Sequence, residues 1–229
     1  RKINRCVVSV GAVERVFMAR QSCRGPEIWP GSVFSIANGF RFQMVPPIVP
    51  PVTAKPNPTP DKTLRRGWTT GACATAAVRG ALMALWGQGF PPRVTIVLPR
   101  GETPEFALAE TSSGPGWAEA GVTKDAGDDP DVTHGCLVRA RVRAGAPGAG
   151  LCFVAGEGVG IVTKPGLPVA VGAPAINPVP RQMMQAQVSE LAAALGQSED
   201  VEVTISVPGG AAVAEKTWNP RLGIVGGLS

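Results

Sequence analysis

The segment at residues 46–60 most constrains how this chain can fold, because seven of its fifteen positions are proline. Proline fixes φ and lacks a backbone N–H, so such a segment favours an extended, polyproline-like linker over a helix or an interior strand. We therefore expect the 229-residue chain to divide here. Residues 1–62 are predicted to be a poorly ordered leader that ends in the linker, and residues 63–229 to be the folded body.

Charge divides the chain at the same place. Residues 1–62 carry nine basic and three acidic side chains, a net charge of +6, whereas residues 63–229 carry thirteen basic and fourteen acidic ones, a net charge of −1. The overall charge of +5 thus belongs to the leader. The body also lacks a run of Lys and Arg with interleaved aromatic residues, so the sequence argues against a nucleic-acid partner.

The five cysteines and the single histidine favour neither a disulfide framework nor a structural zinc site, because the cysteine count is odd and no CxxC occurs. Reduced thiols are typical of a cytoplasmic protein, and we expect no metal. No apolar run reaches the roughly 18 residues of a membrane-spanning helix, and the N-terminus lacks the pattern of a secretory signal. The sequence leaves the oligomeric state open.

Two helices are predicted in the body from local signals. Thr69 or Thr70 can cap the first, which covers about residues 71–86 and has apolar residues at i, i+3, i+4 and i+7. The second begins near Pro178, a residue favoured in the first turn, and ends at Gly196.

Strands are predicted at residues 93–98, 132–143 and 202–207. In the longest of these, alternation places His134 and Val138 on one apolar face and Arg139 on the opposite face. Helices and strands in this order predict a mixed α/β (α+β) fold, with a glycine-rich mixed sheet flanked by helices and preceded by the Pro-rich leader.

The first candidate site is the run RRGWTTG at residues 65–71. Free backbone N–H groups and the positive end of a helix dipole suit a carboxylate or phosphate, and Arg65 and Arg66 add charge. An ordinary capped helix is the favoured interpretation of these residues taken alone. Cys73 follows where a helix dipole can activate a thiol as a nucleophile, although a small buried residue in an alanine-rich helix is favoured.

The second candidate is KDAGDDPDVTHG at residues 124–135, in which four carboxylates within seven residues precede the histidine. A metal or acid/base site and a capped turn both explain this composition, but the spacing is not that of an EF-hand. Crowded carboxylates repel one another unless a cation, a donor cluster or a ligand offsets them. His134 is either an acid or base near neutral pH or a buried structural residue.

The third candidate is GEGVGIVTKPGLP at residues 156–168. It fails the G-x-G-x-x-G dinucleotide pattern, because its third glycine comes one place early. Alternate glycines would still let a ligand approach the backbone closely, with Glu157 and Lys164 as charged neighbours. A glycine-rich turn followed by a proline-shaped loop is the alternative.

Five motifs, taken in order, resemble the cobalt-precorrin-5B C-1-methyltransferase family of anaerobic cobalamin biosynthesis. They are LRRGWTTGACATAA, GDDPDVTHG, GEGVGIVTKPGLPVAVGAPAINPVPR, ISVPGG and TWNPRLGIVGG, and they extend over residues 64–227. The resemblance implies methyl transfer from S-adenosyl-L-methionine to ring carbon C-1 of a cobalt-containing tetrapyrrole, cobalt-precorrin-5B, giving cobalt-precorrin-6A. Family members continue beyond the last motif, so it also implies that this chain lacks a C-terminal part.

The resemblance also implies roles for residues within the motifs. Corrin precursors carry many carboxylates, so the substrate-binding candidates are Arg65, Arg66, Thr69, Thr70, Lys164, Arg181 and Arg221. The candidates for contact with the cosubstrate are Asp128, Glu157, Gly158 and Gly160. His134 and Asp131 are the catalytic candidates. Two other functions stay open: a non-catalytic corrinoid-binding fragment, and an enzyme that uses the Gly-rich loops for a phosphate ligand.

Overall fold

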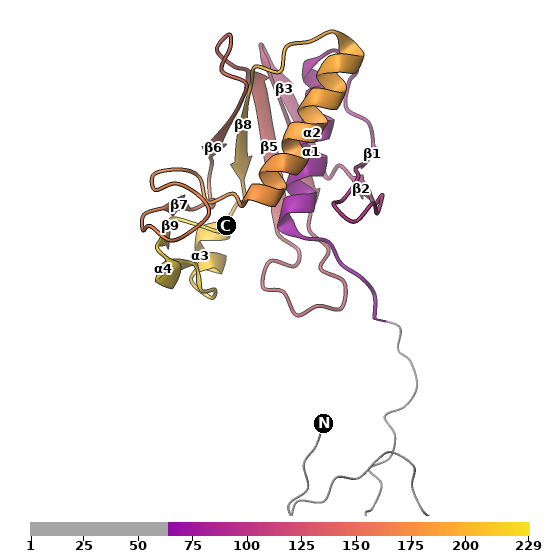
Figure 1. Ribbon diagram of the computed structural model, residues 1–229. Coiled ribbons are helices and arrows are strands. Elements are labelled where there is room, and N and C mark those ends of the chain that lie inside the picture. The colour runs from indigo at the N-terminus through magenta and orange to yellow at the C-terminus, as the bar shows by residue number, and fades with distance from the viewer. Residues whose placement is uncertain (1–63) are drawn as a thin grey trace, which may run out of the picture. The chain divides into compact units, whose positions relative to one another are not determined.

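The computed structural model describes residues 64–229 (Figure 1). The predicted leader at residues 1–62 lies outside the described residues, so the division of the chain stays a prediction. The elements in chain order are α1 (Thr70–Leu85), β1 (Arg93–Thr95), β2 (Glu105–Ala107), β3 (Glu110–Gly114), β4 (Trp117–Thr123), β5 (Leu137–Ala144), β6 (Leu151–Ala155), β7 (Ile161–Val162), α2 (Pro178–Leu195), β8 (Val201–Ser206), α3 (Gly210–Ala214), α4 (Asn219–Leu222) and β9 (Ile224–Val225). Within the described part, no helix has the length and apolar character needed to cross a membrane.

A five-stranded mixed sheet in the order β3-β4-β5-β8-β6 forms the centre of this part. Its neighbours pair antiparallel except β6 and β8, which are parallel and are joined by a crossover that contains α2. Helices α1 and α2 lie against each other, and they cover one face of the sheet (Figure 1). The predicted mixed α/β fold is confirmed.

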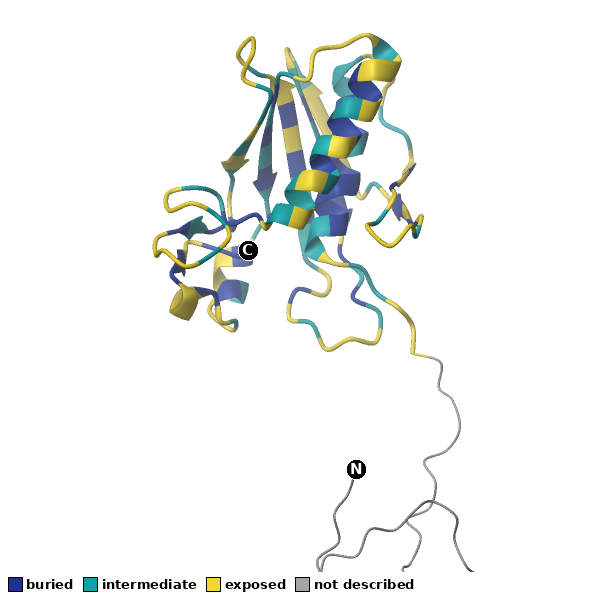
Figure 2. Cartoon of the chain, in the orientation of Figure 1, coloured by how far each residue is buried: buried dark blue, intermediate teal, exposed yellow. Residues whose placement is uncertain are grey.

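Helix α1 packs on the sheet through small side chains. Thr69 caps it, as predicted, by accepting a hydrogen bond on Oγ1 from the Ala72 amide at 3.1 Å. Figure 2 shows buried residues along most of the helix. They include Ala77, which meets a sheet whose inward residues Ala120 and Ala140 are fully buried. Small residues on both sides allow the helix and sheet backbones to approach closely.

Helix α2 follows its predicted bounds. Pro178 stands in its first turn, and Gly196 ends it in the left-handed region at φ 64°. Asn177 occupies the N-cap position, but its side chain makes no capping hydrogen bond. The helix packs through an apolar stripe that includes Met184 and Val188, both fully buried.

The predicted strand at residues 132–143 is wrong at its start, because β5 begins only at Leu137. Asp131 caps a turn there, since its Oδ1 accepts a hydrogen bond from the Thr133 amide at 2.7 Å and its carbonyl accepts one from the His134 amide at 2.9 Å. His134 is therefore exposed and does not lie on the apolar face. The strand predicted at residues 93–98 is likewise shorter and ends at Thr95.

The arginines of β5 point away from the helices and pair with glutamates on neighbouring strands. The pairs are Arg139 with Glu110, Arg141 with Glu119, and Arg143 with Glu202. The last is bidentate, with N–O distances of 2.8 and 2.9 Å. These pairs confirm the alternation predicted for the strand, although exposed ion pairs add little to stability.

Gly158 is a position where the backbone requires glycine. Its φ is +71°, and a Cβ there would lie 2.0 Å from the Val207 carbonyl oxygen. The Leu228 amide donates to its carbonyl oxygen at 2.9 Å. The close approach to the backbone that the sequence suggested for a ligand is thus made at this glycine by the chain itself.

We expect Gly158→Ala to lower the free energy of unfolding by about 3 kcal/mol, since left-handed strain adds to a steric clash. Gly148→Ala is the matched control: its φ is +76°, yet nothing lies within 4 Å of the added Cβ. Strain alone should then cost about 1 kcal/mol. Urea unfolding of both variants measures the difference, and equal losses would contradict the packing described for Gly158.

Candidate functional site

A groove with a volume of about 750 Å³ lies where the N-termini of α1 and α2 meet the C-terminal end of β8. Four of the predicted site residues line it: Arg66, Thr69, Thr70 and Asp131. Its apolar wall includes Val159, Ile176, Met184, Ile205, Val207 and Leu228. Residues from separate motifs of the sequence therefore share one cavity, which is mostly apolar and has charged groups at one side.

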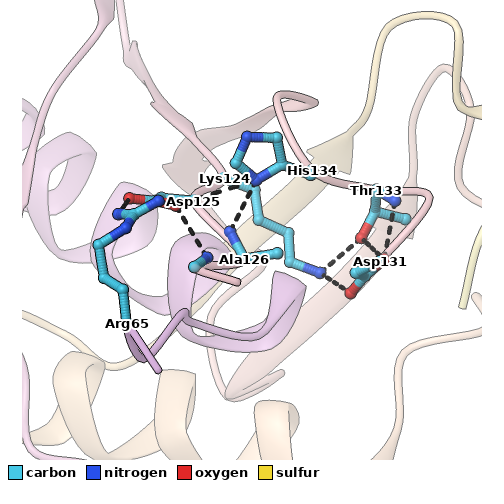
Figure 3. Close-up of polar contacts among 8 residues, drawn as sticks. Arg65, Lys124, Asp125, Ala126, Asp131, Thr133 and His134 are labelled. Carbon is cyan, nitrogen blue, oxygen red and sulfur yellow. Dashed lines mark hydrogen bonds and ion pairs between the residues drawn. The ribbon is translucent and has the colours of Figure 1, made fainter. Parts of the chain in front are cut away.

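Lys124 is the buried charge of this groove, with only 3% of its surface exposed. Its Nζ donates hydrogen bonds to Asp131 Oδ2 and to Thr133 Oγ1 (Figure 3). The Thr133 hydroxyl in turn donates to Asp131 Oδ1 at 2.6 Å. A buried ammonium is tolerated only with such partners, so the loop from 124 to 133 is organised around this lysine.

Asp131 is held as an anion. Partial burial raises its pKa, but the hydrogen bonds from Lys124 and Thr133 outweigh that effect and bring the pKa down to about 2. A carboxylate of this kind suits electrostatic contact with a cationic group better than proton transfer near neutral pH. Its catalytic role stays a prediction.

Two of the other carboxylates of the acidic cluster, Asp125 and Asp128, find partners within the chain. Asp125 forms a bidentate pair with Arg65, whose hydrogen bond is the main cause that lowers the pKa of Asp125 to about 2. The Arg65 amide donates to Asp128 Oδ2 at 2.7 Å. Arg65 and Asp128 line a second cavity of about 540 Å³, which shares Arg66, Thr69 and Asp131 with the groove. Among residues 64–229, no three His, Cys, Asp or Glu side chains are placed to share a metal ion.

His134 lies on the outer side of the same loop (Figure 3). Its Nδ1 accepts a hydrogen bond from the Ala126 amide at 3.0 Å and lies 3.9 Å from Asp125 Oδ1. It lines neither cavity. These contacts give it a place in holding the loop, and its catalytic assignment stays a prediction.

Besides Arg65, three predicted substrate-binding residues lie outside the groove lining. Arg181 donates from Nε to the Ile176 carbonyl at 2.8 Å and from Nη2 to the Pro174 carbonyl at 2.9 Å. Lys164 is exposed and packs beside Gly223, while Arg221 stacks on an exposed tryptophan ring at 4.7 Å. Arg181 thereby fixes the backbone that leads into α2.

The predicted cosubstrate contacts at residues 157–160 also have internal partners. Glu157 Oε1 accepts a hydrogen bond from the Gly209 amide at 3.4 Å. Gly158 and Gly160 are buried against other segments, and between them only Val159 lines the groove. The two glycines therefore position Val159 in the groove wall without lining the groove themselves.

Sequence reasoning missed Lys124 and Arg100 as groove residues. Arg100 lies in the exposed turn after β1 and makes no ion pair with another residue of the described part. The available signal for Lys124 was its position as the one cation at the head of an acidic run. Cys73, by contrast, is the small buried residue that the sequence favoured, and burial raises the pKa of its thiol to about 11.

Asp131→Asn should destabilise the chain in a pH-dependent way. The pKa of Asp131 is about 2 in the folded chain and about 3.9 in an unfolded one. The carboxylate therefore stabilises the fold above pH ~4, and this contribution is lost as the pH falls toward 2. We expect a difference of about 1–2 kcal/mol at pH 6, allowing for solvent screening, and almost none at pH 2.

Asp129→Asn is the matched control, because Asp129 is exposed and its side chain makes no hydrogen bond or ion pair within residues 64–229. Chemical denaturation of both variants from pH 2 to pH 7 makes the comparison. A pH-independent difference for Asp131→Asn would contradict the lowered pKa.

Known proteins resemble this chain in sequence and in fold. A family model described as CbiD matches residues 57–229. The cobalt-precorrin-5B C(1)-methyltransferase of Paramagnetospirillum magneticum is 62% identical over 169 residues, which cover 74% of this chain and 47% of that protein. The protein of the same name from Rhodospirillum rubrum is 63% identical over 168 residues, covering 73% and 46%.

One solved structure is also similar, the crystal structure of the cobalamin biosynthesis protein cbiD from Archaeoglobus fulgidus. It is 31% identical with a TM-score of 0.56, and the match covers 72% of this chain and 51% of that chain. The chain spans about half the length of the relatives it matches. With most of its residues matched by the family model, the chain belongs to the CbiD family.

Proposed function

We propose that this chain serves in the S-adenosyl-L-methionine-dependent methylation of ring carbon C-1 of cobalt-precorrin-5B, giving cobalt-precorrin-6A in cobalamin biosynthesis. It would do so as the part that matches about half of a cobalt-precorrin-5B C(1)-methyltransferase. One observation carries the proposal: residues from four of the five motifs that resemble the family line a single groove. These residues include Arg66, Asp131, Val159 and Val207.

The chemistry of the groove suits a tetrapyrrole. Such a macrocycle has a broad apolar face and a rim of carboxylates, and the groove offers an apolar wall with three cationic side chains beside it. These are Arg66, Arg100 and Lys124. Its volume of about 750 Å³ falls within the ordinary range for small-molecule sites.

The part of the chain in the reaction is to position the reactants. S-Adenosyl-L-methionine supplies a methyl group that is already activated on a cationic sulfur, so alignment is the main task left to the protein. Asp131, an anion at neutral pH, provides a favourable electrostatic contact for a cation in the groove. Met184 and Ile205 exclude water from the wall on which a macrocycle would lie.

A cytoplasmic location is part of the proposal. Cys73, Cys136 and Cys152, the cysteines of the described part, are all free thiols. Free thiols are typical of proteins kept in a reducing compartment.

Isothermal titration calorimetry of the 229-residue chain tests the proposed ligands. We expect binding of S-adenosylhomocysteine and of cobyrinic acid, a corrinoid with free carboxylates, and no binding of ATP. Binding of ATP alone would instead indicate an enzyme that uses the Gly-rich loops for phosphate. Binding of the corrinoid without S-adenosylhomocysteine or S-adenosyl-L-methionine would indicate a non-catalytic corrinoid-binding fragment.

Arg66→Met should weaken cobyrinic acid binding about tenfold, as expected for one charge-assisted hydrogen bond. Arg93→Met is the matched control. Both arginines pair with a glutamate and are similarly exposed, at 59% for Arg66 and 57% for Arg93, but only Arg66 lines the groove. Equal affinities of the two variants, measured by calorimetry, would remove Arg66 from the substrate site.

A further inference from the structure

Lys124 has hydrogen-bonding capacity that its own loop does not use. An ammonium group carries three N–H donors. Two of them are accounted for by Asp131 and Thr133, and no third acceptor for Nζ lies among residues 64–229. Lys124 is nonetheless almost fully buried and lines the groove. A buried cation with a spare donor at a cavity wall is suited to an anionic group of a ligand.

Asp131 holds Lys124 in place while accepting only one of the three N–H groups of its ammonium. Oδ2 accepts from Lys124, and Oδ1 accepts from both the amide and the hydroxyl of Thr133, at 2.7 and 2.6 Å. The carboxylate therefore fixes the position of the ammonium group. One N–H group of the ammonium still has no acceptor among residues 64–229.

The first turn of α1 adds donors on the same groove. Thr70 and Gly71 both line the groove, and their amides donate to no residue of the described part. The next two amides are satisfied by Thr69, through its Oγ1 and its carbonyl oxygen. The two free amides stand at the positive end of a 16-residue helix.

Backbone pairing brings the lysine and this turn together. The Trp68 amide donates to the Asp125 carbonyl at 2.8 Å, which ties the residue before Thr69 to the residue after Lys124. The charge of Lys124 also acts on Cys73 in α1, where it lowers the pKa of the thiol against the larger opposing effect of burial. The lysine therefore lies near the start of the helix.

We propose that Lys124 Nζ and the amides of Thr70 and Gly71 form a subsite that binds one carboxylate of the ligand. The subsite itself does not depend on the proposed function, but the identity of its ligand does. Two groups in the proposed reaction have the right chemistry: a side-chain carboxylate of the tetrapyrrole, and the α-carboxylate of S-adenosyl-L-methionine.

Acetate is the probe that tests the subsite independently of the proposed reaction. In ¹H–¹⁵N spectra of the 229-residue chain, we expect added acetate to shift the amide signals of Thr70 and Gly71. Lys124→Met should weaken this binding about tenfold or more. Lys216→Met, which removes an exposed lysine outside the groove, should leave it unchanged. Shifts of equal affinity in the wild type and Lys124→Met, or no shift of either amide in the wild type, would overturn the subsite.

A second pair of variants decides the matter if Lys124→Met fails to fold. Thr70→Pro removes one amide donor at the first helical position, where proline is accepted, and the preceding Thr69 has an extended ψ of 157° that proline also accepts. Thr70→Val removes the hydroxyl but keeps the amide. We expect acetate binding, followed at Gly71, to weaken about tenfold in Thr70→Pro relative to Thr70→Val. Equal affinities would overturn the role of the amide.

The source of the carboxylate is distinguished by two matched pairs of ligands. Cobyrinic acid has free side-chain carboxylates, whereas most of those of cobinamide are amidated. S-Adenosylhomocysteine carries an amino-acid group with its carboxylate, whereas 5′-methylthioadenosine has a methyl group in its place. If the subsite serves the tetrapyrrole, Lys124→Met weakens cobyrinic acid and leaves the other three unchanged. If it serves the cosubstrate, only S-adenosylhomocysteine is weakened. Failure of all four ligands to bind the wild type would contradict the proposed function, whereas the acetate result decides the subsite.

Discussion

The contact of α1 with the central sheet is the constraint on which the groove depends. Helix α1 packs on β4 and β5, and both sides of this contact contain fully buried alanines, among them Ala77, Ala120 and Ala140, which let the two backbones approach closely. This packing sets the distance between the helix and the sheet. It also places the N-terminus of the helix on the same groove as the C-terminal end of β8. Because Thr69 and Thr70 belong to that terminus, the position of the polar side of the groove depends on the packing of alanines that do not line it, such as Ala77.

The helices could be predicted closely from the sequence, because their signals are local. Thr69, Pro178 and Gly196 each act within one turn of the backbone, and the structure places all three where the sequence suggested. The sheet was harder to predict. Strand β3 is polar and β4 is rich in small residues, so neither shows the β-branched alternation that identifies a strand. The alternation of apolar residues predicted a strand that includes His134, but Asp131 caps a turn there and the strand begins later.

The groove itself could not be predicted, because it forms only when the chain returns through the β6–α2–β8 crossover. That return brings Val207 and Val159 to the same wall.

The glycines of GEGVG illustrate the difference between a motif and a site. Gly158 makes room for the backbone of Val207, so folding itself requires glycine at this position. The glycine spacing that suggested a ligand-binding loop therefore marks a place where two segments of the chain pack together. Lys124 shows the opposite case: it was not among the predicted site residues, and its burial in the groove wall makes it a candidate.

The burial of Cys73 makes the thiol a reporter on the integrity of this region. With a pKa near 11, almost none of it is thiolate at neutral pH, and no surface is open to a reagent. Cys152 is exposed and Cys136 partly so, and both can react while the fold is intact. Alkylation of Cys73 requires this region to open, because its side chain has no exposed surface. The rate of Cys73 alkylation, followed by mass spectrometry of the peptide that contains this cysteine, thus measures how often this side of the groove opens.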